Sequence, residues 1–113
     1  MADSIISIAV MEPLDGLEED FLRILAELYA LMERKGYSRD TLLRNRKQPP
    51  HYIHIRYWSS LTARQEAQED PAVQRCWARL GNLCHMLRVH DVLDEVDWRS
   101  APPDSERNVS SED

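Results

Sequence analysis

Hydrophobic positions along this chain follow two different periods. Between Leu17 and Lys35 they recur every three or four residues, which predicts an amphipathic helix that ends where Gly36 can take a left-handed conformation. Acidic residues crowd the start of this stretch, and Asp15 is its predicted N-cap. Residues 5–11 are instead β-branched and almost wholly apolar, as is typical of a buried strand.

Segments of both kinds continue along the rest of the chain. Two prolines in Lys47–Pro50 cannot donate to a strand ladder, so this stretch is predicted to be a four-residue hairpin loop. The segment Ser59–Thr62 offers N-caps for one helix, and Asp70-Pro71 offers the cap and first residue of the next. The elements expected around these signals are, in order, a strand at Thr41–Leu43, a strand at His51–Trp58, a helix at Leu61–Glu69, a helix from Pro71 to about His85 and a strand at Met86–Val96.

This order of elements predicts a ferredoxin-like α+β domain, βαββαβ, with a four-stranded antiparallel sheet covered by helices on one face. In the strand His51–Trp58, the side chains of His54, Arg56 and Trp58 share one face. The residues between them are apolar or aromatic and share the other face, so neither face is suited to water. We therefore expect a second copy to cover the helix-free face, which gives a homodimeric α+β barrel.

Length and charge narrow the class of protein. The 113 residues suffice for one domain, expected over residues 1–98, with a disordered acidic tail over residues 99–113. A net charge of −6 argues against a nucleic-acid partner, which would need clustered Lys and Arg. No apolar run is long enough to cross a membrane, so we expect a cytoplasmic protein without a membrane partner.

The segment Trp58-Ser59-Ser60-Leu61-Thr62-Ala63 and the later Asp70-Pro71-Ala72-Val73 resemble the antibiotic biosynthesis monooxygenase family, and the resemblance extends over about residues 4–97. It implies a dimeric α+β barrel and, for the quinone-forming members, oxygenation without a cofactor. The family pattern has histidines at two positions where this chain has Ala67 and Ala72. That departure puts catalysis in doubt more than it does the fold.

Three residues of the central strand are the candidate catalytic group. By the resemblance, Trp58 and His54 line the cavity. A neutral His54 could take a phenolic proton, and Arg56 could stabilise the phenolate that results. Core packing explains Trp58 equally well, and a solvated surface would account for the other two.

Tyr29, Trp77 and His85 are the candidate substrate-binding residues. Tyr29 is chosen from its place on the inward stripe of the first helix, whereas core packing competes as the explanation for Trp77 and helix capping for His85. No metal site is expected, because His51 and His54 lie three apart on a strand and point to opposite faces.

These features favour a cofactor-independent monooxygenase that acts on a small phenolic or quinol compound in a cavity between helices and sheet. Two alternatives stay open: a non-catalytic member of the same fold that binds a small ligand or serves as a dimeric scaffold, and an isomerase of small dicarbonyl compounds. Consumption of oxygen would separate the first reading from both alternatives.

Overall fold

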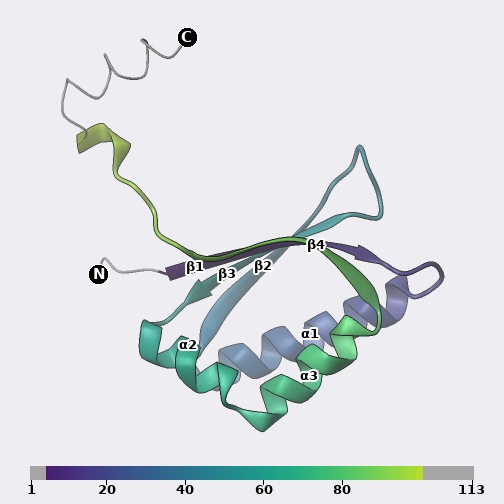
Figure 1. Ribbon diagram of the computed structural model, residues 1–113, viewed down its shortest axis with the longest axis horizontal. Coiled ribbons are helices and arrows are strands. Elements are labelled where there is room, and N and C mark those ends of the chain that lie inside the picture. The colour runs from purple at the N-terminus through teal and green to yellow at the C-terminus, as the bar shows by residue number, and fades with distance from the viewer. Residues whose placement is uncertain (1–4, 101–113) are drawn as a thin grey trace.

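The computed structural model describes residues 5–100. Its four strands form one antiparallel sheet in the order β2-β3-β1-β4, which confirms the predicted ferredoxin-like α+β topology (Figure 1). The elements are β1 (Ile5–Pro13), α1 (Glu18–Arg34), β2 (Ser38–Arg44), β3 (Tyr52–Trp58), α2 (Leu61–Gln68), α3 (Pro71–Gly81) and β4 (Cys84–Leu93), followed by a short 3-10 turn, Trp98–Ser100.

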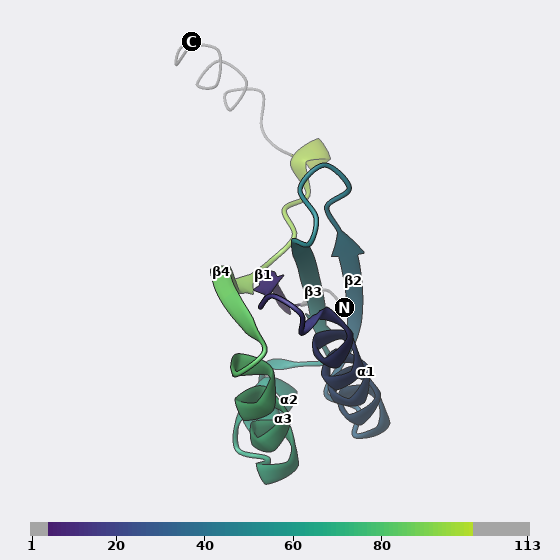
Figure 2. The ribbon, with the colours of Figure 1, turned by 90° about the vertical axis from the view of Figure 1, so that its right-hand side faces the viewer.

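The helices α1, α2 and α3 lie on one side of the sheet, which we call the helix face, and no helix within residues 5–100 covers the opposite, outer face (Figures 1 and 2). The strand β3 alternates strictly between buried and half-buried residues, with His54, Arg56 and Trp58 on the helix face as predicted. Apolar side chains of α1, α3 and the sheet fill the space between the layers, with Phe21 and Met32 among those fully buried.

Local capping chemistry sets most of the helix boundaries. The Ser60 hydroxyl accepts a hydrogen bond from the Ala63 N–H at the start of α2, and Asp70 caps α3 ahead of Pro71. The prediction of Asp15 as N-cap of α1 is wrong, because the helix begins after Leu17, which makes no side-chain cap. The negative charge of its first turn, Glu18 to Asp20, still lies where the helix dipole favours it.

The hairpin between β2 and β3 is longer than the sequence predicts. Strand β2 already begins at Ser38, and the β2–β3 pairing extends only as far as Asn45, whose N–H donates to the His51 carbonyl at 3.0 Å. The Asn45 side-chain oxygen accepts a hydrogen bond from the Lys47 backbone N–H at 2.9 Å. This contact stabilises a loop that is wider than the four residues predicted. In this register Asp40 lies opposite Arg56, so both side chains are on the helix face.

The last strand begins earlier than expected. Helix α3 ends at Gly81, and β4 begins at Cys84, which pairs with Pro13 of β1. His85, predicted to end the helix, therefore lies on an edge strand. Of the predicted tail, only Arg99 and Ser100 are among the described residues, where they close the 3-10 turn. Within residues 5–100, no helix is both long and apolar enough to span a membrane.

Candidate active site

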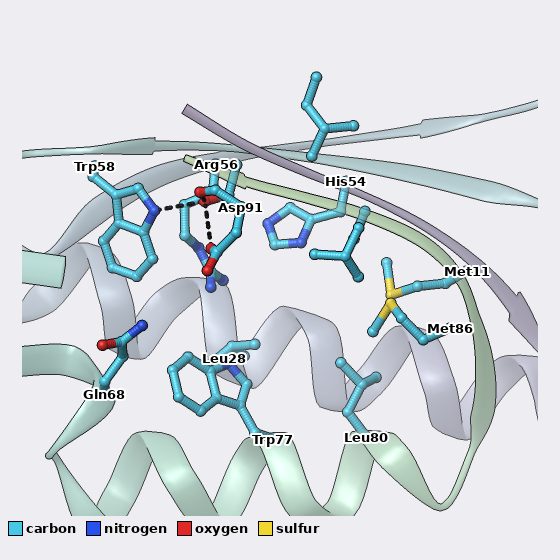
Figure 3. Close-up of a pocket in the computed structure, with 14 residues that line it drawn as sticks. Met11, Leu28, His54, Arg56, Trp58, Gln68, Trp77, Leu80, Met86 and Asp91 are labelled. Carbon is cyan, nitrogen blue, oxygen red and sulfur yellow. Dashed lines mark hydrogen bonds between the residues drawn. The ribbon is translucent and has the colours of Figure 1, made fainter. Parts of the chain in front are cut away.

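A cavity of about 170 Å³ lies between the helix face of the sheet and helices α1 and α3 (Figure 3). Its sheet side carries the polar groups of His54, Arg56 and Trp58, and its helix side is formed by apolar residues that include Leu28 and Trp77. A few convergent polar groups on an otherwise apolar wall are the usual composition of a small-molecule site.

Arg56 and His54 share one buried carboxylate. The Arg56 Nε–H donates to Asp40 Oδ1 at 2.6 Å, and His54 Nε2 lies 3.1 Å from the same oxygen. The three side chains are 6%, 11% and 1% exposed for Arg56, His54 and Asp40 respectively, so solvent screens their charges little. The cluster therefore fixes two cavity-lining side chains through a single residue on the neighbouring strand.

Burial and charge set the protonation of this cluster. Burial alone would raise the pKa of Asp40, but the hydrogen bonds from His54 and Arg56 and the Arg56 charge outweigh it and hold that pKa below its ordinary value. Burial is the largest influence on His54 and lowers its pKa below 6.5, although the hydrogen bond to Asp40 opposes this shift. At neutral pH the site thus holds an ionised Asp40, a charged Arg56 and a neutral His54.

Two buried polar atoms around the cluster have no hydrogen-bond partner among the described residues: Arg56 Nη2 and the Tyr29 hydroxyl. Burying a donor without a partner costs about 1–3 kcal/mol, so native proteins seldom do so without a reason such as a bound polar group. The Tyr29 ring packs against the His54 imidazole, with centroids 5.0 Å apart. Burial raises the pKa of Tyr29 above its ordinary value of 10.0, and its hydroxyl therefore stays neutral.

Trp58 is held by a hydrogen bond at the end of the cavity. Its indole N–H donates to Ser7 Oγ at 2.8 Å, and that hydroxyl lies 2.5 Å from the Asp91 carbonyl oxygen, to which it donates. The Asp91 carboxylate in turn pairs with Arg64 on α2 at 2.5 Å. The indole donor is therefore already engaged, whereas Arg56, which also lines the cavity, retains one buried donor without a partner within residues 5–100, Nη2.

Of the predicted substrate-binding residues, one lines this cavity and two do not. Trp77 lines it, whereas Tyr29 packs against the His54 ring without lining the cavity itself. His85 is exposed on β4 opposite Glu12 and does not contribute to the lining of this cavity. Ala67, which stands where the family has a histidine, is fully buried in the core.

Sequence reasoning missed four polar residues of the site: Asp40, Ser7, Gln68 and Asp91. Asp40 precedes the strand that the sequence predicts at Thr41–Leu43, and only the register of β2 against β3 brings it opposite Arg56. Ser7 could have been found as the one polar residue of the apolar stretch between Ile5 and Met11 of β1. No pattern in the sequence marks Gln68 or Asp91.

Comparison with known proteins agrees with this architecture. The family model described as antibiotic biosynthesis monooxygenase matches residues 4–79. Among solved structures, SnoaB from Streptomyces nogalater, a cofactor-independent oxygenase, is similar with a TM-score of 0.69 at 22% identity, over 85% of this chain and 99% of that one. Protein SO0527 from Shewanella oneidensis has a TM-score of 0.69 at 18% identity, over 84% and 93% of the two chains. No curated protein matches the chain.

Proposed function

The chain belongs to the antibiotic biosynthesis monooxygenase family, and from that premise we propose that it oxygenates a small phenolic or quinol compound without a cofactor. The observation that carries this proposal is the unpartnered Nη2 of Arg56, a buried cationic donor beside a neutral histidine at the wall of an apolar cavity. Such a donor fits an anion that forms only after the ligand has entered and lost a proton.

The cluster supports a two-stage reaction. His54, neutral at physiological pH, takes the phenolic proton, and Arg56 stabilises the phenolate. The electron-rich ring then reacts directly with oxygen at a ring carbon that bears hydrogen, para to the phenolate in a phenol and ortho to it in a quinol. One oxygen atom stays on that carbon in the quinone product and the other leaves as water with two hydrogens of the substrate, so the substrate itself supplies all four electrons.

The size of the cavity limits the substrate. A cavity of about 150 Å³ accommodates one benzene ring in a protein core. The volume here, about 170 Å³, therefore favours a single-ring phenol or hydroquinone. Met86 and Val89 of β4 line the cavity yet are 50% and 55% exposed, so a larger ligand would protrude along this edge.

Oxygen uptake tests the proposal. Metal-stripped protein would be given single-ring hydroquinones, naphthoquinols and anthrones in an oxygen electrode. We expect uptake above background with the single-ring compounds and a loss of about 10²–10³-fold in Arg56→Met, the usual cost of removing one donor to a developing oxyanion. Arg79→Met is the matched control, because this exposed arginine of α3 pairs with Glu27 and does not line the cavity.

Three outcomes would contradict the proposal. Equal losses in the Arg56 and Arg79 variants would remove the assigned role of Arg56. Absence of uptake with every compound would leave ligand binding as the better description. Turnover of a dicarbonyl compound without oxygen consumption would favour the isomerase, for which His54 at the cavity wall offers a base.

We further propose that the protein is a homodimer joined through the outer face of the sheet. Apolar residues of adjacent strands meet on this face, with Ile8 opposite Ile55 and Val10 opposite Ile53. These side chains are half-buried, and none of the helices in the described part of the chain covers them (Figure 2). A continuous apolar sheet face of this kind is stabilised when a second sheet packs against it.

Sedimentation equilibrium tests the dimer. We expect twice the chain mass for the natural protein and the single-chain mass for Ile55→Lys, because an unpaired ammonium group would be buried between the sheets. Leu22→Lys is the control, because this exposed apolar residue lies on α1, on the opposite side of the sheet from the outer face. A monomeric natural protein would refute the dimer.

A further inference from the structure

The Asp40 carboxylate accepts from two cavity-lining side chains through one oxygen, and it does not line the cavity itself. Resting on the proposed function, we propose that Asp40 is a positioning residue: it holds His54 as the tautomer protonated at Nε2, which leaves Nδ1 as the atom that accepts the substrate proton. It also holds the Arg56 guanidinium by its Nε, which leaves Nη2 for the phenolate.

The tautomer follows from the hydrogen-bond chemistry of the cluster. An ionised carboxylate can only accept, so the His54 nitrogen that faces Asp40 must carry a hydrogen. A neutral imidazole has one N–H, and its other nitrogen then has a free lone pair. Since His54 is neutral at physiological pH, Nδ1 is the basic atom.

The surroundings of His54 leave Asp40 as the group that decides this tautomer. The imidazole faces the Tyr29 ring from α1 and the Arg56 guanidinium along β3. Its cross-strand neighbours are Ala9 on β1 and Leu42 on β2, which offer no side-chain hydrogen bond. Of the described charged groups around the ring, Asp40 is the acceptor and Arg56 is a cation that disfavours protonation.

Arg56 is oriented by the same oxygen. Its Nε–H donates to Asp40 Oδ1 while its guanidinium lies over the Trp58 ring, 5.3 Å from the centroid. Two contacts on different parts of one planar group fix its orientation. The side chain projects from the sheet into the cavity (Figure 3). The second Asp40 oxygen, Oδ2, accepts from the Ser38 hydroxyl at 3.4 Å, which completes the support of the carboxylate.

The test is to read the His54 tautomer directly by nitrogen-15 NMR of the imidazole rings. The chain has 4 histidines, and the His54 signals are assigned by their loss in His54→Gln. In the natural protein at pH 7.5 we expect the proton on Nε2. Because Arg56 Nε and His54 Nε2 face the same oxygen, the amide of Asp40→Asn could still accept from both, so the informative variant is Asp40→Leu. Asp40→Leu leaves His54 Nε2 without an acceptor, and both tautomers of the imidazole should then be populated.

The matched control is Asp70→Asn. Asp70 is also a buried carboxylate, held by Lys35 and Tyr37 at 2.7 Å each, but it caps α3 and does not line the cavity. Its variant should retain the Nε2-protonated tautomer of His54 and the oxygen uptake of the folded protein. In Asp40→Leu we expect kcat to fall by about 10²–10⁴-fold, the usual contribution of a general base, with a smaller change in KM.

The outcomes separate this inference from the proposed function. An Nδ1-protonated His54 in the natural protein would overturn the inference without any variant, so a failure of Asp40→Leu to fold does not weaken the test. Oxygen uptake that is equal in the natural protein and in folded Asp40→Leu would also overturn it and leave the oxygenase standing. The expected tautomers without oxygen uptake would support the role of Asp40 and refute the oxygenase.

Discussion

Replacing Arg56 with methionine removes one partner of a buried ion pair and leaves the other in place. The Asp40 side chain is 1% exposed and that of Arg56 is 6%, with 2.6 Å between Nε and Oδ1. In Arg56→Met the carboxylate would keep only the hydrogen bonds from His54 and Ser38. A buried charge left without its counter-charge is strongly destabilising, whereas removing both charges is often close to neutral.

The burial of the pair sets the expected magnitude. Breaking a buried pair from one side costs about 3–5 kcal/mol, and breaking an exposed one costs about 0–1 kcal/mol. We therefore expect Arg56→Met to lower the free energy of unfolding by about 3–5 kcal/mol at pH 7. The double variant Asp40→Asn/Arg56→Met should be at least as stable as Arg56→Met, because it removes the uncompensated carboxylate.

Urea unfolding followed by circular dichroism measures these values. All variants must be compared at one protein concentration, since the stability of a dimer depends on it. Arg79→Met is the reference for an exposed pair, as its side chain and that of Glu27 are 56% and 48% exposed and 3.1 Å apart. A loss in Arg56→Met no larger than in Arg79→Met, or additive losses in the double variant, would refute the reasoning.

Three further predictions concern the same site. Burial lowers the pKa of His54 in the folded protein, so below about pH 6.5 the unfolded chain binds more protons than the folded one. The free energy of unfolding should therefore decrease as the pH falls through that range, and this decrease should be absent in His54→Gln. Trp58→Phe removes the donor to Ser7 Oγ and should cost about 0.5–1.5 kcal/mol, with a smaller loss of oxygen uptake than Arg56→Met; an equal loss would give the indole a direct role. Trp77→Ala enlarges the cavity and should raise kcat/KM for naphthoquinols relative to single-ring hydroquinones; an unchanged ratio would show that Trp77 does not limit substrate size.

The secondary structure was largely readable from the sequence because its signals are local. Helical periodicity located α1, and Gly36 takes the left-handed conformation expected after it, with φ of +74°. Asp70 and Pro71 located the start of α3. Signals of this kind depend on neighbours within a few residues, so they can be interpreted without knowledge of the fold. Asp15 failed because capping needs a specific backbone geometry as well as a suitable side chain.

Part of the site followed from the same local reasoning. Alternation along β3 correctly put His54, Arg56 and Trp58 on one face, since successive side chains of a strand point in opposite directions. Alternation does not report what each side chain touches. The indole of Trp58 donates to Ser7, far away in the sequence, so its availability to a substrate could not be judged from β3 alone.

The sequence by itself determined the elements, their order and the two faces of the central strand, because each of these rests on a short-range period or a turn signal. The tertiary structure alone decided which residues meet. A four-residue loop would have paired Asp40 with Tyr57 and turned its carboxylate to the outer face, whereas the observed register pairs it with Arg56. A shift of one residue reverses every side chain of a strand, and the loop conformation that sets this shift depends on contacts such as that of the Asn45 side chain with Lys47 N.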